Sequence, residues 1–222
     1  MQTETLRLAE LRRLRILDTP PERYFDAIVE QVAELTDCPV ALITLVDSRR
    51  QWFKARHGLA ITQSRRELSF CTHAIRYQGA FEVCDTLADR RFRENLFVTG
   101  TKKVRYYAGV PLVTRAGARI GMLCVLDVRA RDPMPESHWR CLRSSARAVV
   151  AAMEARQQSS ASMPDTSADI SCLPGISRSP AITASSLHRR GAGVARYEPL
   201  GERAPARTLR NAALRLVKPA SA

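Results

Sequence analysis

Long apolar runs are missing from this sequence. Apolar residues make up 45% of its 222 positions, but they are interrupted by polar residues throughout. A helix that crosses a bilayer needs about 18 or more consecutive apolar residues, so no membrane span is predicted. The N-terminal segment MQTETLRLAELRRLRI alternates leucine with charge, whereas a secretory signal needs an uninterrupted apolar stretch. We therefore expect a cytoplasmic protein.

Paired cysteine motifs are also missing. The cysteines occur without any CxxC or CxxxC spacing, at Cys38, Cys71, Cys84, Cys124, Cys141 and Cys172. Because cytoplasmic thiols stay reduced, we predict no disulfide framework. Four ligands at the spacing of a structural zinc site are absent as well, so no metal site is predicted. The sequence leaves any cofactor unidentified.

Acidic residues are few. The chain has 22 Asp and Glu against 35 Lys and Arg, and its formal net charge is +13. This balance favours phosphate-rich or acidic partners, or else a basic, solvated surface. The aromatic-interleaved basic motif of a nucleic-acid module is absent. We favour the solvated surface, and keep a nucleic-acid-binding adaptor that acts through a basic tail as an alternative.

The chain changes character near residue 156. Residues 157–222 are rich in Ser, Ala, Pro, Gly and Arg, and Tyr197 is their single aromatic residue. Too little apolar surface is present there to offset the entropy of an ordered chain. We predict a low-complexity basic tail, disordered, after an N-terminal helix at 1–20 and a domain at 21–156.

Residues 3–36 carry two helical patterns. Leucines among arginines predict a helix from Thr3 to Ile16, packed on the domain or on a second copy. Thr19 and Glu22 have the spacing of a capping box, with Pro20 at the first helical position. Apolar residues then recur at helical spacing, which predicts a strongly amphipathic helix: Phe25, Ile28, Val29, Val32, Ala33 and Thr36.

Hairpins dominate the rest of the body. Residues 38–47 and 51–58 read as one pair of strands around the turn at 47–50, and residues 104–113 and 118–128 as a second pair. A short strand at 81–85 and a polar loop at 85–103 lie between the pairs. A helix from Pro135 to Arg156 closes the body. This order predicts an α+β layer architecture with a central antiparallel sheet of five or six strands and flanking helices.

The segment SFCTHAI, residues 69–75, brings a cysteine and a histidine close in sequence. On a helix, residues two apart point about 200° apart, so Cys71 and His73 would not form a pair. An extended segment would place both on one face and reverse that conclusion. A buried core cysteine with a histidine at the rim is the favoured interpretation, and a ligand contact is the alternative.

Several separate motifs resemble a GAF domain. They are ILDTPPE at residues 16–22, the VDSRRQWFKA hairpin, SFCTHAI, VCDTLADRRFRENLFVTG and IGMLCVLD, and the resemblance covers about residues 5–156. More narrowly, these motifs resemble the sensory GAF domains found at the N-terminal end of bacterial histidine kinases and diguanylate cyclases. This resemblance implies a GAF/PAS-like sheet, a small-molecule pocket on one face, and a homodimer through the first and last helices.

The resemblance also implies a function. We expect a regulatory domain that binds an unknown small molecule or senses redox state in two-component or cyclic di-GMP signalling. It would act on a separate output protein, such as a histidine kinase or diguanylate cyclase, and we expect no enzyme activity of its own. The pocket candidates are Phe70, Cys71, His73, Asp85, Phe92, Arg105, Tyr107 and Cys124, with Arg105 proposed for an anionic group and Tyr107 for stacking.

The resemblance to one GAF subfamily implies an alternative function. Its members reduce free methionine-R-sulfoxide with pocket cysteines, which requires a thiolate and a resolving thiol. Cys71 falls near the corresponding helix, and Cys71, Cys84 and Cys124 could converge in the pocket. The loop at 85–103 contains no cysteine, although this loop carries an active-site cysteine in the reductases. We therefore keep the reductase as an alternative.

Overall fold

A computed structural model describes residues 3–158 of the chain. The predicted disorder of the basic tail, and its predicted role in binding nucleic acid, therefore fall almost entirely outside the described residues. No helix among residues 3–158 combines the length and the apolar character that crossing a membrane requires.

The centre of the domain is an antiparallel sheet of six strands in the order β3-β2-β1-β6-β5-β4. The strands are β1 Val40–Val46, β2 Arg50–His57, β3 Gln63–Arg65, β4 Phe81–Val83, β5 Tyr106–Val113 and β6 Arg119–Asp127. The two predicted hairpins form as β1–β2 and β5–β6, and β1 pairs with β6 to join them. Strand β3 is short and polar, so its sequence gives no alternating pattern.

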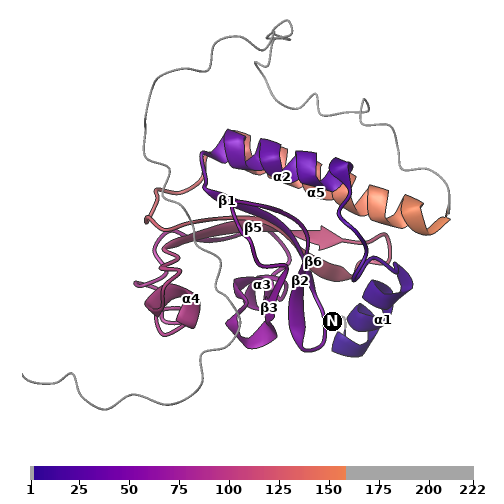
Figure 1. The fold of residues 1–222 in the computed structure, drawn as a ribbon, viewed down its shortest axis with the longest axis horizontal. Helices are drawn as coiled ribbons and strands as arrows, with labels where there is room; N and C mark the ends of the chain where they lie inside the picture. The colour runs from indigo at the N-terminus through magenta and orange to yellow at the C-terminus, as the bar shows by residue number, and fades with distance from the viewer. Residues whose placement is uncertain (1–2, 159–222) are drawn as a thin grey trace, which may run out of the picture. The chain divides into compact units, whose positions relative to one another are not determined.

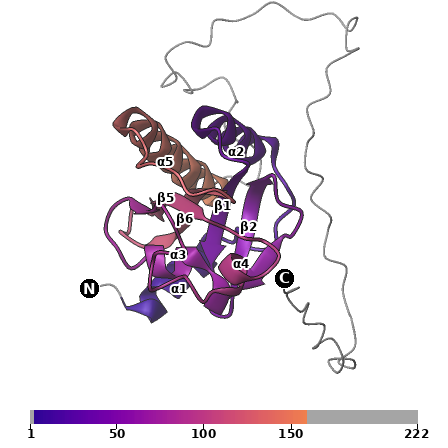
Figure 2. The ribbon, with the colours of Figure 1, turned by 90° about the vertical axis from the view of Figure 1, so that its left-hand side faces the viewer.

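Two long helices cover one face of the sheet, as Figures 1 and 2 show. They are α2 Arg23–Thr36 and α5 Glu136–Gln158. All the residues predicted for the apolar face of α2 are buried, and the apolar ones pack in one cluster with Ala41, Ile43 and Leu45 of β1. We call this the helix face of the sheet.

Short elements cover the opposite face, which we call the α3 face (Figure 1). They are the 3-10 helix η1 Arg66–Leu68, α3 Phe70–Ala74 and α4 Leu96–Thr99. Leu42 and Val46 of β1 point to this side, and they form a second core cluster with side chains from α3 and the 85–103 loop. Because both faces are covered, β1 and β6 are buried almost throughout.

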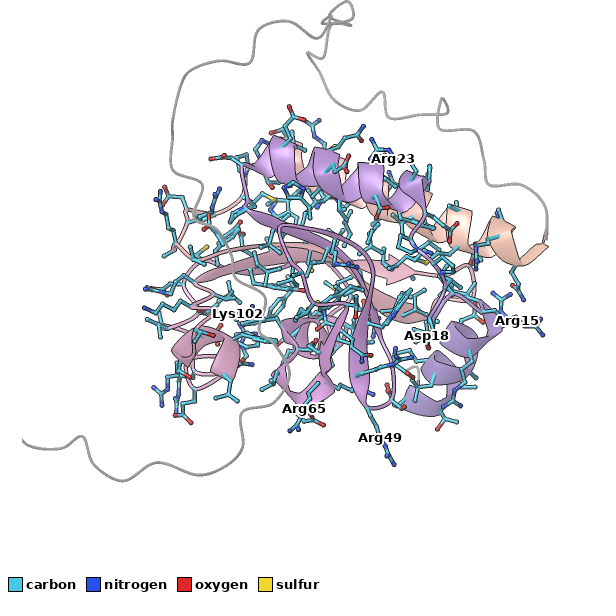
Figure 3. The ribbon with its side chains drawn as sticks, viewed as in Figure 1. Arg15, Asp18, Arg23, Arg49, Arg65 and Lys102 are labelled. Atoms are coloured by element: carbon cyan, nitrogen blue, oxygen red, sulfur yellow. The ribbon has the colours of Figure 1, made fainter. Side chains whose placement is uncertain are left out.

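The N-terminal helix α1, Glu4–Arg13, is shorter than the predicted Thr3–Ile16. Thr3 caps it, and Leu11 and Leu14 are buried in the helix-face core. The helix thus packs on its own domain, while Leu6 is 61% exposed. In Figure 3 the labelled Arg15 and Asp18 lie in the connection from α1 to α2.

The predicted capping box at the start of α2 is wrong. Glu22 is the N-cap residue, but its side chain makes no capping hydrogen bond. Lys54 of β2 binds the Glu22 carboxylate, the Thr19 hydroxyl at 2.9 Å and the Pro20 carbonyl at 2.8 Å. A buried ammonium group needs these oxygens more than the helix terminus does, because an unpaired buried charge is very costly.

Candidate functional site

A group of polar side chains lies inside the α3-face core. Cys71 comes from α3, Cys124 from β6, Tyr107 from β5, Gln51 from β2 and Thr44 from β1. Each of these residues is at most 5% exposed. We call these five residues the thiol cluster.

Contacts within the thiol cluster converge on one sulfur atom. The Cys71 Sγ lies 3.2 Å from the Tyr107 hydroxyl and 3.8 Å from the Cys124 Sγ. The Gln51 side-chain amide donates a hydrogen bond to the same sulfur at 3.2 Å. An amide N–H can only donate, so Gln51 favours negative charge on Cys71.

The pKa values of the two thiols are shifted in opposite directions. Burial opposes ionisation of Cys71, but hydrogen bonds from Cys124, Thr44, Tyr107 and Gln51 outweigh it and hold the pKa of Cys71 below its ordinary value. The hydrogen bond to Cys71, together with burial, raises the pKa of Cys124 well above its ordinary value. Burial likewise raises the pKa of Tyr107. Cys71 is therefore the thiol that ionises first.

Gly109 makes room for these contacts. It pairs with Cys124 across β5 and β6. A Cβ atom at position 109 would lie 2.9 Å from the Cys124 Cβ and 3.2 Å from the Tyr107 hydroxyl. Because real Cβ atoms do not approach so closely, a side chain at Gly109 would displace the cluster.

Aromatic rings from α3, β4 and the 85–103 loop pack around Tyr107 of the thiol cluster. Phe70 stacks on Tyr107 with ring centroids 5.5 Å apart and lies 4.8 Å from Phe92. Phe81 meets the Tyr107 and Phe92 rings edge-on. Arg91, held by Asp89, lies over the Phe81 ring at 4.8 Å. The space that the resemblance assigned to a small molecule is thus lined by side chains in contact with one another.

The eight pocket candidates separate into two groups. Phe70, Cys71, Phe92, Tyr107 and Cys124 come together on the α3 face, and His73 lies at their edge with its ring 5.1 Å from that of Phe92. Burial and nearby arginines lower the pKa of His73. His73 and Cys71 point to different neighbours, as the helical spacing predicted.

Asp85 and Arg105 bind each other instead. The Arg105 guanidinium makes two hydrogen bonds to the Asp85 carboxylate, at 2.8 and 3.0 Å. A carboxylate therefore already occupies the group that we had proposed for an anionic ligand. The pair fixes the start of the 85–103 loop beside β5, where the Thr86 amide donates to the Arg105 carbonyl.

Only two of the three cysteines considered for the pocket converge. Cys84 packs against the helix-face core, not the thiol cluster. None of the five cysteines between residues 3 and 158 forms a disulfide.

On the helix face, a second polar group lies near the end of α5. Lys54 has a fully buried side chain and pairs with Glu22. Arg156, from the last turns of α5, also contacts the Glu22 carboxylate at 3.3 Å and the Arg15 carbonyl at 3.4 Å. We call Glu22, Lys54 and Arg156 the carboxylate clamp.

Three grooves in the described part of the chain are lined by residues outside the thiol cluster. One of about 610 Å³ is bordered by Cys38, Tyr106, Arg131 and His138, where β6 leads into α5. The Arg131 guanidinium there is engaged by Asp127 and by the carbonyls of Thr36 and Asp37. This groove therefore offers little free hydrogen-bonding capacity from Arg131.

The family model described as GAF domain matches residues 20–153. This chain belongs to the GAF domain family. The GAF domain of a phosphoenolpyruvate-protein phosphotransferase from Coxiella burnetii superposes with a TM-score of 0.51 at 13% identity, over 71% of this chain and 100% of that one. The corresponding Acinetobacter domain gives 0.48 at 21% identity, over 69% and 97%.

A curated relative links this GAF domain to signalling. A protein named cyclic di-GMP phosphodiesterase, from Pseudomonas aeruginosa, is 40% identical over 150 residues, which are 68% of this chain. The chain spans 26% of the length of that relative. Family and relative together support a regulatory role in signalling. Our expectation that the chain has no enzyme activity of its own is wrong, because this relative is named as an enzyme.

Sequence reasoning missed Gln51, Thr44, Phe81 and Arg91. Gln51 could have been found, because period-two alternation puts it on the same side of β2 as Phe53, which packs on the α3 face. Arg91 could not, because its position over Phe81 depends on the path of the 85–103 loop.

Proposed function

We propose that this GAF domain senses a chemical signal on its α3 face and regulates an enzyme of cyclic di-GMP turnover. The observation that carries the proposal is the 40% identity over 150 residues to the Pseudomonas phosphodiesterase. The output is supplied by a histidine kinase, a diguanylate cyclase or a phosphodiesterase. The pocket candidates on the α3 face remain our choice for the residues that receive the signal.

Strand β2 supports a route from the signal to the output. Gln51 contacts Cys71 on the α3 face, and Lys54, three residues along, holds the carboxylate clamp on the helix face. Movement of Cys71 would therefore reach Arg156 through one strand. Helix α5 would transmit the change, as a shift between two populated arrangements.

We further propose a homodimer in which α1 and α5 pair with their counterparts. Leu6 of α1 is 61% exposed, which leaves an apolar side chain available on that helix. Native mass spectrometry of the full chain would report the subunit count and any retained small molecule together. A monomer at micromolar concentration would remove the dimer from the proposal.

A chimera tests the regulatory function directly. The matched region of the Pseudomonas phosphodiesterase would be replaced by residues 1–158 of this chain, and cyclic di-GMP hydrolysis measured with and without candidate signals. We expect a severalfold change of rate with one of them. A chimera that hydrolyses at one fixed rate under every signal, while the parent enzyme responds, would contradict the proposal.

Substitutions at Phe92 and Tyr107 test the receiving site. If a small molecule is the signal, Phe92→Ala and Tyr107→Ala should reduce the ligand-dependent rise in melting temperature. Leu96→Ala is the matched control, since Leu96 is 63% exposed on α4. Unchanged ligand-dependent shifts in folded variants would place the ligand elsewhere.

A further inference from the structure

We infer that Cys71 and Cys124 form a redox pair that a hydroperoxide converts to a disulfide, with Cys71 the attacking thiol and Cys124 the resolving thiol. The inference rests on the proposed function, and it names the chemical class of the signal. Its basis is the geometry of the thiol cluster, in which two free thiols 3.8 Å apart lie among hydrogen-bonding groups.

Several polar groups contact the Cys71 sulfur, which distinguishes this site from an ordinary buried cysteine. A core cysteine behaves as a small apolar residue and needs no partners. Here a buried amide, a buried tyrosine hydroxyl and a second thiol all reach the Cys71 sulfur. Burying Gln51 and Tyr107 costs free energy that a weak thiol acceptor recovers poorly, whereas a thiolate recovers it well.

The two thiols differ as the chemistry requires. The same hydrogen bonds that hold the pKa of Cys71 down stabilise its thiolate, and the pKa of Cys124 is raised. The thiolate is the nucleophile, and a neutral neighbour is available for the second step. Gly109 keeps that neighbour within reach, since any larger residue would separate Cys124 and Tyr107 from their positions.

The reaction balances in two steps. The Cys71 thiolate attacks the outer oxygen of the hydroperoxide, so an S–O bond forms, the O–O bond breaks, and an alcohol leaves with the thiol proton. The Cys124 sulfur then attacks the sulfenic sulfur of Cys71, so the S–S bond forms and the S–O bond breaks. Hydroxide leaves and takes the Cys124 proton as water. Two thiols are oxidised and one hydroperoxide is reduced to alcohol and water.

Disulfide formation requires the sulfur atoms to approach. A disulfide is about 2.05 Å long, so the contact of 3.8 Å must shorten. Cys124 lies on a central strand, whereas Cys71 lies on the five-residue helix α3. We therefore expect α3 to move toward the sheet and the contact between Cys71 and Gln51 of β2 to change.

The experiment uses the reduced full-length chain and cumene hydroperoxide, followed by peptide mapping without reductant. We expect a Cys71–Cys124 disulfide to form about tenfold faster than any product at the buried Cys38 and Cys141, which are internal controls. Equal rates at all four thiols, or a first disulfide that uses another cysteine, would overturn the inference.

Two variants test the roles of the residues. Cys124→Ala should stop at a Cys71 sulfenic acid that dimedone traps, and a failure to trap it in the folded variant would count against the resolving role. Gln51→Met should slow the first step severalfold, with Gln31→Met on α2 as the matched control. Equal rates in both variants would remove Gln51 from the activation of Cys71.

The outcomes separate this inference from the proposed function. If no disulfide forms and the chimera still responds to a small molecule, the redox inference is overturned and the regulatory function stands. If the disulfide forms and the chimera hydrolyses at one fixed rate under every signal, while the parent enzyme responds, the thiol chemistry stands and the regulatory function is overturned.

Discussion

The two faces of the sheet bury polar groups in opposite ways. On the helix face a full charge, that of Lys54, is matched by the Glu22 carboxylate and two further oxygens. On the α3 face a thiol, a hydroxyl and an amide gather around the sulfur of Cys71. The helix face therefore holds the α1–α2 connection and α5 in place, and the α3 face holds a group that can change its chemistry.

This difference predicts where substitutions destabilise the fold and where they alter function. Loss of a partner on the helix face leaves a buried charge, which costs much free energy. Loss of a partner on the α3 face removes one hydrogen bond between an uncharged side chain and the Cys71 sulfur, which costs less. The following predictions test the contrast, from the largest effect to the smallest.

Removal of the charge at Glu22 should have the largest effect. Glu22→Gln leaves Lys54 buried without its counter-ion, and we expect a loss of about 3 kcal/mol in the free energy of unfolding measured with urea. Glu30→Gln is the control, because its pair with Arg23 is exposed, and it should cost less than about 0.5 kcal/mol. Similar losses in the two variants would mean that the carboxylate clamp stabilises the fold no more than an exposed ion pair does.

A methyl group at Gly109 should come next. Gly109→Ala forces apart Cys124 and Tyr107, and we expect a loss of about 2 kcal/mol by thermal unfolding. Gly79→Ala is the matched control, since nothing lies within 4 Å of its added Cβ. If both variants have the melting temperature of the wild type, Gly109 is not packed against Cys124 as closely as the structure shows.

Two neighbouring tyrosines compare the faces within one strand. Tyr106 donates to the Glu82 carboxylate at 2.7 Å on the helix face, and Tyr107 contacts Cys71 on the α3 face. We expect Tyr106→Phe to cost about 2 kcal/mol and Tyr107→Phe about 1 kcal/mol. Equal losses measured by urea unfolding would remove the proposed difference between charged and neutral partners.

Acid should act weakly and locally, at α1. Hydrogen bonds from Arg7 and Arg66 lower the pKa of Glu4 from 4.5 to about 2. Because the pKa is lower in the folded state, this stabilisation is complete above pH 4.5 and is lost as the pH falls towards about 2. We expect amide exchange in α1 to quicken over that range, by hydrogen exchange and mass spectrometry.

The Arg7→Met variant provides the check on the acid effect. It removes the larger of the two hydrogen-bonding partners of Glu4, so the titration of Glu4 followed by NMR should move towards 4.5. A titration identical to that of the wild type would assign the lowered pKa to another cause.

Much of the fold was predictable because its patterns are local. The helical spacing of apolar residues from Phe25 to Thr36 matches the buried face of α2 in the structure. The two hairpins also form as the sequence predicts. The sequence did not predict β3, because Gln63–Arg65 is polar and is held by pairing with β2 rather than by burial. The capping box failed because Lys54, distant in sequence, competes for Glu22.

The candidate site was predicted in part. Five of the eight pocket candidates come together in one core cluster: Phe70 and Cys71 on α3, Tyr107 and Cys124 on neighbouring strands, and Phe92 in the 85–103 loop. Asp85 and Arg105 pair with each other, which neither position indicates by itself. The division at residues 20 and 156 and the role of the candidates stay predictions.

The missing side chain at position 109 has a practical use. Inside a strand a glycine weakens the sheet, and here it lets the Cβ of Cys124 and the hydroxyl of Tyr107 lie close to the backbone of β5. A related protein that keeps both cysteines but carries alanine at this position should retain the architecture and react sluggishly with peroxides. The residue at position 109 would then distinguish related GAF domains that respond to peroxides from those that respond to another signal.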